Sequence, residues 1–342
     1  MDALSLLHAE VFGRAPHAVT PLTQAGSNRT YYRLSANDGT SSIGVVGSNR
    51  AENRAFLYLA RHFEDKGLPV PHIIAATPDD SCYLQQDLGN LSLYDALAEG
   101  RRRGGQFDAR QTQWLTATMR LLPHVQIKGA EGLDTNRLLP PTAFDRRTVL
   151  FDLHYFKYCF FKVVDAPMPD ESALEDDFEH LADNLVACCG EKPCFLYRDF
   201  QARNVMLVED EPYLIDFQSG RHGSLHYDVA SFLWQASAGY TPQLRALLLD
   251  EYLDEAATLA PIDSGRFRSE LRLFVFFRTL QVLGAYGLRG YFERKPHFLQ
   301  SIPPAINNLQ RQLDEGVAAP YPVLQEALRS LVALPRFSNS HS

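Results

Sequence analysis

The sequence has few cysteines, no excess of basic residues and no long apolar run, and each shortage excludes a class of protein. Its 342 residues include five cysteines and no Cys-x-x-Cys pair, so we expect neither a disulfide framework nor a zinc site. Lysine and arginine total 33 against 41 acidic residues, and the net charge of −8 argues against a nucleic-acid partner. The apolar stretches, such as 273–277, are far shorter than the roughly 18 residues that a membrane helix needs.

The N-terminal segment also lacks the features of a secretory signal. It has no basic region and no long apolar region, and Asp2 and Glu10 add acidic charge. Together with the low cysteine count, this predicts a cytoplasmic protein. The composition, with 45% hydrophobic and 22% charged residues, is typical of a globular chain, and the length suggests two domains or two lobes at about 150 residues each.

Two different patterns follow one another along the chain. Up to residue 87, short runs of β-branched and aromatic residues alternate with turns, and one helix is expected at 52–63. After Gly89 helical patterns dominate, interrupted by one hairpin at 205–208 and 213–217. We therefore predict an α/β (α+β) protein of two lobes, a small antiparallel sheet lobe at 1–87 and a large helical lobe at 88–342. The expected strands are 19–22, 30–34, 42–46, 73–76 and 82–85, and the expected later helices are 91–102, 107–125, 143–163, 172–187, 226–239, 242–258, 264–288 and 320–333.

The most informative motif is an Asp-x-x-x-x-Asn loop followed by a hairpin. Asp199 and Asn204 are five residues apart, and Asp216 follows at the end of the second predicted strand. Phosphoryl transfer needs a carboxylate beside the attacking hydroxyl and oxygen ligands that hold Mg²⁺ against nucleotide phosphates. We predict Asp199 as the base, and Asn204 and Asp216 as the metal ligands.

These motifs resemble those of the aminoglycoside phosphotransferase family, which has a protein-kinase-like fold, over roughly residues 20–260. Within that family the chain is most similar to bacterial cell-wall kinases of the amino sugars N-acetylmuramate and N-acetylglucosamine. Tyr197 stands where the family usually has a scaffold histidine, and Gln218 stands where protein kinases have glycine. The resemblance implies a small-molecule kinase that uses ATP and Mg²⁺ to phosphorylate a hydroxyl group, with a sugar or amino sugar as the expected substrate.

Two segments are expected to bind the nucleotide. The turn between the first two strands contains Gly26, Ser27 and Asn28, whose amides and side chains would cover the phosphates. The turn alone would look the same in a plain hairpin, but its order before the catalytic loop favours the phosphate loop. The segment 84–89 resembles the family's hinge, so backbone groups of Gln86 and Leu88 are expected to bind adenine.

One expected residue is missing. The third strand of a kinase carries a lysine that touches the phosphates and pairs with a helix glutamate, but residues 42–47 contain none. Arg29 or Arg33 could supply the cation instead, with Arg29 favoured as a nucleotide-binding residue because it is nearer the glycine turn, and Glu52 could orient it. Alternatively, Glu52 is a solvated glutamate in the first turn of its helix.

The substrate side is less defined, and two other functions stay open. Arg198, Gln201 and Arg203 flank the predicted base and, with Gln218, are candidates for substrate contacts, although Arg198 could instead form an internal ion pair. One alternative is a kinase of a cationic alcohol such as choline or an aminoglycoside. The other is a nucleotide-binding pseudokinase, which the missing lysine favours and the intact Asp199, Asn204 and Asp216 set opposes.

Overall fold

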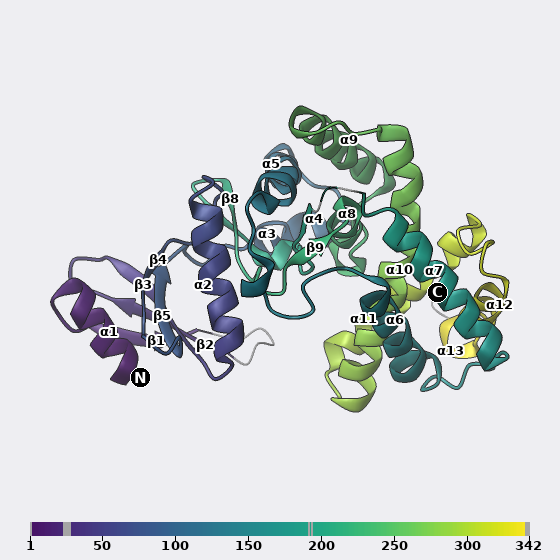
Figure 1. Ribbon diagram of the computed structural model, residues 1–342, viewed down its shortest axis with the longest axis horizontal. Helices are drawn as coiled ribbons and strands as arrows, with labels where there is room; N and C mark the ends of the chain where they lie inside the picture. Colours follow the sequence, from purple (N-terminus) through teal and green to yellow (C-terminus); the bar gives the residue numbers. More distant parts are fainter. Residues whose placement is uncertain (1, 23–28, 191, 193, 339–342) are drawn as a thin grey trace. The chain divides into compact units, whose positions relative to one another are not determined.

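The computed structural model describes residues 2–22, 29–190, 192 and 194–338 (Figure 1). Contacts within the chain divide it into unit 1, Met1–Thr142 with Tyr197–Arg221, and unit 2, Ala143–Leu196 with His222–Ser342. Unit 1 therefore joins the N-terminal sheet to the segment that carries the Asp-x-x-x-x-Asn loop. This division differs from the lobe boundary at 87–88 that the sequence predicts, and that boundary stays a prediction.

A five-stranded antiparallel sheet forms the first part of unit 1, in the order β1-β2-β3-β5-β4. The β2–β3 hairpin turns at Gly39, whose φ of 84° suits glycine, so the Asn-Asp-Gly turn lies where the sequence predicts it. The strands are β1 (Ala18–Pro21), β2 (Arg29–Ser35), β3 (Ser41–Gly47), β4 (Ile73–Ala76) and β5 (Cys82–Gln86).

One helix packs on each face of this sheet, because side chains alternate along a strand. Helix α1 (Asp2–Phe12) places Leu4 and Leu7 against Leu34 and Leu84. On the opposite face, Phe56 of α2 (Arg50–Glu64) stacks on Tyr83, the neighbour of Leu84 in β5, with ring centroids 5.5 Å apart. Figure 1 shows α1 and α2 on the two sides of the sheet. Tyr83 is thus positioned beside α2, where the site described below is built.

The rest of unit 1 is helical apart from a second hairpin. Strands β7 (Val205–Val208) and β8 (Glu211–Leu214) pair in register, and the turn residues Glu209 and Asp210 have φ of 52° and 69°. Two positive φ values in a two-residue turn match the right-handed twist of the strands. The other elements are α3 (Leu93–Ala96), α4 (Ala98–Arg102), α5 (Ala109–Ile127) and the 3₁₀ turns η1 (Lys128–Ala130), η2 (Thr135–Arg137) and η4 (Ala202–Asn204).

Unit 2 is built mainly of helices around α10 (Ser264–Gly287), whose residues Phe274, Phe276, Phe277 and Leu280 are fully buried. Helices α6 (Arg146–Phe156), α8 (Leu225–Leu233) and α11 (Pro296–Asp314) pack directly against α10, as do the π turns η3 (Lys157–Phe161) and η6 (Leu288–Phe292). Around them, α7 (Glu171–Ala187) contacts α6 and α12 (Pro322–Val332), and α9 (Pro242–Leu259) contacts α8. The remaining elements are α13 (Pro335–Ser338), the 3₁₀ turn η5 (Ala236–Ala238) and the strands β6 (Cys194–Leu196) and β9 (Arg221–Gly223), of which β9 begins at the last residue of unit 1.

The expected fold class is confirmed: a small antiparallel sheet is joined to a larger helical part. Some boundaries were predicted wrongly. The helix expected at 226–239 ends at Leu233, and the strand expected to reach residue 217 ends at Leu214. Helices α1 and α11 were not predicted, and α11 contains Pro303 and Pro304, which break a helical pattern in sequence.

By length and composition, one stretch within the described ranges could cross a membrane. It is Ser264–Phe292, which joins α10 to η6 and has a mean hydropathy of 1.2 over its most apolar window. Since 61% of that window is buried inside the structure, the stretch has the burial of a core helix.

Candidate active site

Tyr197 fixes the start of the Asp-x-x-x-x-Asn loop to the end of the β7–β8 hairpin. Its side chain is fully buried, and its hydroxyl donates to the backbone carbonyl of Ile215. Its ring packs edge-on against Phe200 and Phe217, at centroid distances of 5.5 and 6.3 Å. This tyrosine, at the position where a scaffold histidine is usual, therefore holds the loop beside the residue that precedes Asp216.

Asn204 closes the loop on itself. Its Nδ2 donates to the backbone carbonyl of Asp199 at 2.8 Å, and its backbone N–H donates to the carbonyl of Gln201 at 2.8 Å. In turn, its own carbonyl accepts from the N–H of Ile215 at 3.0 Å. Because the amide nitrogen is used within the loop, Oδ1 is the atom of Asn204 that suits a hard cation.

Asp216 lies two residues after β8 in a left-handed backbone conformation, with φ of 68°. Such a conformation is uncommon for a residue other than glycine and persists where neighbours hold it. Its Oδ1 accepts from Arg29 Nη2 at 3.0 Å and from Gln218 Nε2 at 2.9 Å, while 37% of the side chain is exposed. The carboxylate is therefore oriented through one oxygen and still open to solvent.

Arg29 at the start of β2 joins the sheet, α2 and the Asp216 loop. Its side chain is 1% exposed, and its Nε lies 3.4 Å from Glu52 Oε1. Its Nη1 donates to the Tyr83 hydroxyl at 3.3 Å, and the guanidinium carbon lies 5.5 Å from the centre of the Phe56 ring. A single buried cation thus links an acid of α2 to the acid of the metal motif.

The charge of Arg29 is compensated by its surroundings. Burial works to lower the pKa of the guanidinium, but Tyr83, Tyr31, Asp216 and Glu52 together raise that pKa above its ordinary value. Arg29 is therefore a permanent cation in this site. Such a charge can neutralise a carboxylate or a phosphate equally well.

A glycine makes the space for this arginine. Gly47 of β3 lies opposite Arg29 in the strand register, at the end of the strand that lacks a lysine. A Cβ atom at Gly47 would lie 2.4 Å from Asn53 Oδ1 and 3.0 Å from Arg29 Cγ. A side chain on β3 here would therefore displace Asn53 and press on Arg29, because the side chains of these two residues fill the space.

Arg33, the other arginine that the sequence offers, has a different set of partners. Its Nε and Nη2 bind both carboxylate oxygens of Asp87 at 2.5 and 2.9 Å, and Nη2 also donates to the Gly89 carbonyl at 3.1 Å. Ser41 donates to the same carboxylate at 2.7 Å. Burial raises the pKa of Asp87, but these hydrogen bonds outweigh it and keep the pKa below its usual range. Arg33 therefore fixes the segment after β5, and Arg29 is the arginine that meets Glu52.

The segment that resembles a hinge has a defined backbone pattern. The N–H of Gln86 donates to the His72 carbonyl at 2.8 Å, which keeps it in the β4–β5 ladder. Two residues on, the backbone N–H of Leu88 has no hydrogen-bond partner among the described residues, and the Leu88 side chain is buried. The backbone of this segment thus offers a donor at Leu88.

The remaining predicted residues fall into three groups. Gly26, Ser27 and Asn28 lie outside the described residues. Arg203 stacks on the ring of Tyr94, with its guanidinium carbon 3.6 Å from the ring centre. Arg198, beside the predicted base, has a φ of 75°. The backbone carbonyl of Gln201 accepts from the N–H of Asn204. Gln218 is buried, and its amide nitrogen donates to Asp216.

Sequence reasoning did not find the side-chain roles of three residues that shape the site. Tyr83 contacts Arg29, Asp87 holds Arg33, and Tyr94 supports Arg203. Each is an ordinary strand, loop or helix residue in sequence, so no local signal marks it. Only the strand alternation that places Tyr83 on the α2 face could have suggested one of them.

The described residues contain no group of three or more histidine, cysteine, aspartate or glutamate side chains that could hold a metal ion. A dedicated all-protein metal cage is therefore missing from this part of the chain. The Oδ1 of Asn204 and the carboxylate of Asp216 fit a different type of site, in which Mg²⁺ takes one or two protein ligands and shares its shell with phosphate and water.

Comparison with known proteins agrees with this arrangement. The sequence model of the phosphotransferase enzyme family matches residues 18–262, which confirms the family expected from the motifs. Two proteins named N-acetylmuramate/N-acetylglucosamine kinase are similar to the chain. The one from Pseudomonas aeruginosa is 26% identical over 97% of this chain and 93% of its own, and the one from Neisseria meningitidis is 24% identical over 83% and 82%. The structure of an amicoumacin kinase bound to AMP-PNP, Ca²⁺ and its ligand shares the fold, with a TM-score of 0.54 and 13% identity over 80% of this chain and 81% of its own.

Proposed function

Because the chain belongs to the phosphotransferase enzyme family and is a small-molecule kinase, we propose that it transfers the terminal phosphoryl group of ATP to a hydroxyl of an amino sugar in the cytoplasm. The observation that carries this proposal is the Arg29 bridge. In one unit of the fold, a buried cation connects Glu52 to Asp216, the acid that follows the Asp-x-x-x-x-Asn loop.

Asp199 acts as the base. It stands at the head of the loop, and its own backbone carbonyl is held by the Asn204 amide at 2.8 Å. Its carboxylate would accept the proton of the attacking hydroxyl as the new oxygen–phosphorus bond forms and the bond to the leaving ADP breaks.

Asn204 Oδ1 and the Asp216 carboxylate would hold Mg²⁺, which when bound neutralises charge on the phosphates. Asp216 is already oriented by Arg29 and Gln218 through Oδ1, and no hydrogen bond to its Oδ2 is formed within the described residues. Gln218 therefore serves this site by positioning Asp216, in addition to its expected contact with substrate.

Arg29 takes the place of the missing lysine. The guanidinium is paired with Glu52, as the lysine of a kinase is paired with its helix glutamate, and Gly47 on the third strand gives it room. A planar guanidinium can bind Asp216 and phosphate oxygens with different N–H groups, so it neutralises phosphate charge without leaving Glu52.

The remaining assignments concern the residues that would bind the adenine, the phosphates and the sugar. The N–H of Leu88 and the carbonyl of Gln86 would bind adenine, and Gly26, Ser27 and Asn28 would cover the phosphates. Arg198, Gln201 and Arg203 are proposed to contact the sugar. Similarity to the two amino-sugar kinases over most of the chain supports this substrate class.

The test is a substrate panel with a matched pair of variants. Parent, Asp199→Asn and Asp210→Asn are each incubated with ATP, Mg²⁺ and either N-acetylglucosamine, N-acetylmuramate, choline or an aminoglycoside, and the phosphorylated product is followed by ³¹P NMR. Asp210 is the control because it lies on the same hairpin, in an exposed turn, and pairs with Arg110. We expect amino-sugar phosphate from the parent and the control, and turnover about 100-fold lower or less from Asp199→Asn.

Two outcomes would contradict the proposal. Phosphorylation of choline or the aminoglycoside alone would assign the cationic-alcohol class instead. ATP binding by the parent without turnover of any acceptor would favour the pseudokinase.

A further inference from the structure

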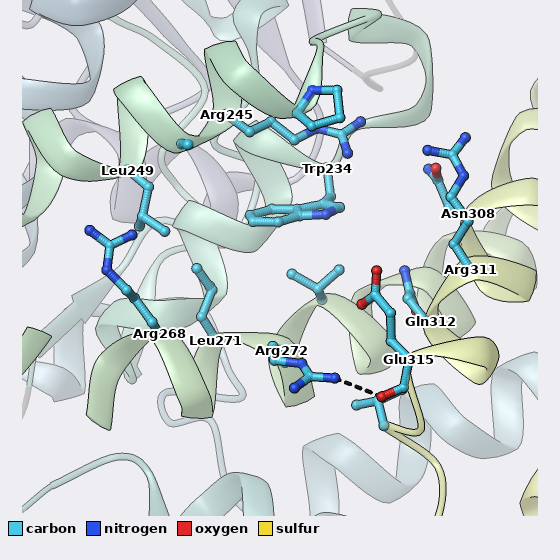
Figure 2. Close-up of a pocket in the computed structure, with 14 residues that line it drawn as sticks. Trp234, Arg245, Leu249, Arg268, Leu271, Arg272, Asn308, Arg311, Gln312 and Glu315 are labelled. Carbon is cyan, nitrogen blue, oxygen red and sulfur yellow. Dashed lines mark hydrogen bonds between the residues drawn. The ribbon is translucent and has the colours of Figure 1, made fainter. Parts of the chain in front are cut away.

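A pocket in unit 2 has no part in the function proposed above. It lies between α9, α10 and α11, has a volume of about 420 Å³, and shares no residue with the Arg29 site. Figure 2 shows the indole of Trp234 in the middle of the lining side chains. Four arginines line the pocket from three different helices, namely Arg245, Arg268, Arg272 and Arg311.

The arginines of this pocket are only partly neutralised. Arg268 forms an ion pair with Asp250, and Arg272 donates to the backbone carbonyl of Glu315 at 2.8 Å (Figure 2). The side chains of Arg245 and Arg311 have no acidic partner among the described residues, and the carboxylate of Glu315 is the one acid that lines the pocket. The lining therefore carries an excess of positive charge.

Arg245 shows the imbalance most clearly. Its Nε is buried and has no hydrogen-bond partner among the residues that the structure describes, and its guanidinium carbon lies 5.6 Å from the centre of the Trp234 ring. Burial lowers the pKa of Arg245, and the charge of Arg311 lowers it further. A half-buried cation near a second cation is costly, and an anion between them would offset that cost.

We propose that this pocket binds a phosphate monoester carried on a sugar ring, with the phosphate at Arg245 and Arg311 and the ring against Trp234. The volume lies within the range of small-molecule sites. The other polar groups select for hydroxyls. Glu315 offers a carboxylate, Asn308 offers an amide, and the Oε1 of the buried Gln312 has no hydrogen-bond partner within the described part of the chain. A ring with hydroxyl donors satisfies these acceptors, whereas inorganic phosphate satisfies only the arginines.

The chain provides its own reporter for this site. It contains two tryptophans, Trp234 in the pocket and Trp114 in α5 of unit 1. In a Trp114→Phe background, fluorescence reports on Trp234 alone. The background is titrated, without ATP, with N-acetylglucosamine 1-phosphate, AMP, inorganic phosphate and N-acetylglucosamine. The first two probes share the proposed chemistry, and their relative affinities identify a hexose phosphate or a nucleotide as the source.

We expect saturable fluorescence changes with one or both of the sugar phosphates, and much weaker binding of inorganic phosphate and of the uncharged sugar. Arg245→Ala and Arg311→Ala should each weaken binding by about 10- to 100-fold, the range for a charged hydrogen bond. Arg266→Ala should bind like the parent, because Arg266 is on the same helix as Arg268 but pairs with Glu270 on the surface. Arg311 is exposed, so its variant tests the site even where Arg245→Ala fails to fold.

Three results would overturn the proposal: no saturable change with either sugar phosphate, equal affinity in the parent and in Arg311→Ala, or equal affinity for inorganic phosphate. Because no ATP is present and no turnover is measured, these results are independent of whether the kinase assignment holds.

Discussion

Arg29 in unit 1 and Arg245 in unit 2 are the same residue type in opposite electrostatic situations. Arg29 is 1% exposed and has Glu52 and Asp216 within 3.4 and 3.0 Å. Arg245 is half-buried, its Nε has no hydrogen-bond partner in the described ranges of the chain, and the charged neighbour that shifts its pKa is another arginine. The pKa of Arg29 is raised above its ordinary value and that of Arg245 is lowered.

The difference shows that burial alone does not determine what a cation does. Desolvation disfavours both charges, and for Arg29 the neighbouring Tyr83, Tyr31, Asp216 and Glu52 reverse the effect. An arginine whose charge is balanced by neighbouring groups orients those groups before any ligand binds, so we assign Arg29 both a structural role and a role at the phosphates. An uncompensated arginine gains its counter-charge only from a ligand, so we assign Arg245 to binding.

The largest expected contrast is in stability. Arg29→Met leaves Glu52 and Asp216, which are 19% and 37% exposed, without their shared cation, and for an ion pair with partly exposed acids we expect a loss of about 2 to 3 kcal/mol. Arg245→Met removes an unpaired charge and keeps much of the apolar contact with Trp234, so we expect a change of less than about 1 kcal/mol. Urea unfolding followed by circular dichroism measures both, and an equal loss in the two variants would contradict the comparison.

Catalysis should separate Arg29 from Arg33. The milder Arg29→Lys keeps a cation near Glu52 but loses the forked geometry, so we expect the KM for ATP to rise by about 10-fold or more. Arg33→Lys should change the KM by less than about 3-fold, since Arg33 contacts Asp87 and Gly89. The check is a pair of ATP titrations at saturating acceptor. A larger effect at Arg33 would show that the cation has been assigned to the wrong arginine.

His226 allows the same comparison for a residue type whose ordinary pKa lies near neutral pH. It is buried between Phe267 and Phe274, and burial, aided by Arg266, lowers its pKa to about 3. Glu270 lies 3.4 Å from its Nε2 but is bound by Arg266 at 2.6 Å, so the acid does not reverse the effect of burial.

The sign of the pH dependence follows from this lowered pKa. Below about pH 6.5 the unfolded chain gains a proton that the folded chain does not, so stability falls between pH 6.5 and pH 3. At pH 5 the loss from this group is about 2 kcal/mol relative to pH 7. The non-titrating His226→Asn should lose less stability than the parent between these two pH values. An identical loss in both would exclude this role for His226.

The sequence predicted those parts of the site that are local in the chain. Asp199, Asn204 and Asp216 lie within one loop and hairpin, so their spacing could be interpreted without tertiary structure. By contrast, the Arg29–Asp216 contact joins residues 187 positions apart. From the sequence, Arg29 and Arg33 could each supply the cation, with Arg29 favoured because it is nearer the glycine turn, and the positions of Asp87 and Glu52 now distinguish them.

The fold, too, was predicted from the sequence only where local patterns mark its elements. The strands of the sheet were predicted closely because turns and β-branched runs mark them. Helix α11 was missed because Pro303 and Pro304 lie within it, where packing of Ile302 and Ile306 into the core outweighs the cost of the prolines. The arginine pocket is lined by residues of α9, α10 and α11, so no pattern within one segment of the sequence indicates it.

The most direct test of the account is whether Mg²⁺ and nucleotide bind through Asp216. AMP-PNP is titrated by calorimetry into the parent, Asp216→Asn and the control Asp210→Asn, with Mg²⁺ and with a chelator. We predict that Mg²⁺ raises the affinity of the parent and of the control by about 10-fold or more, because the metal links the carboxylate to the phosphates. In Asp216→Asn the two titrations should coincide. An undiminished effect of Mg²⁺ in Asp216→Asn would contradict the assignment of this site.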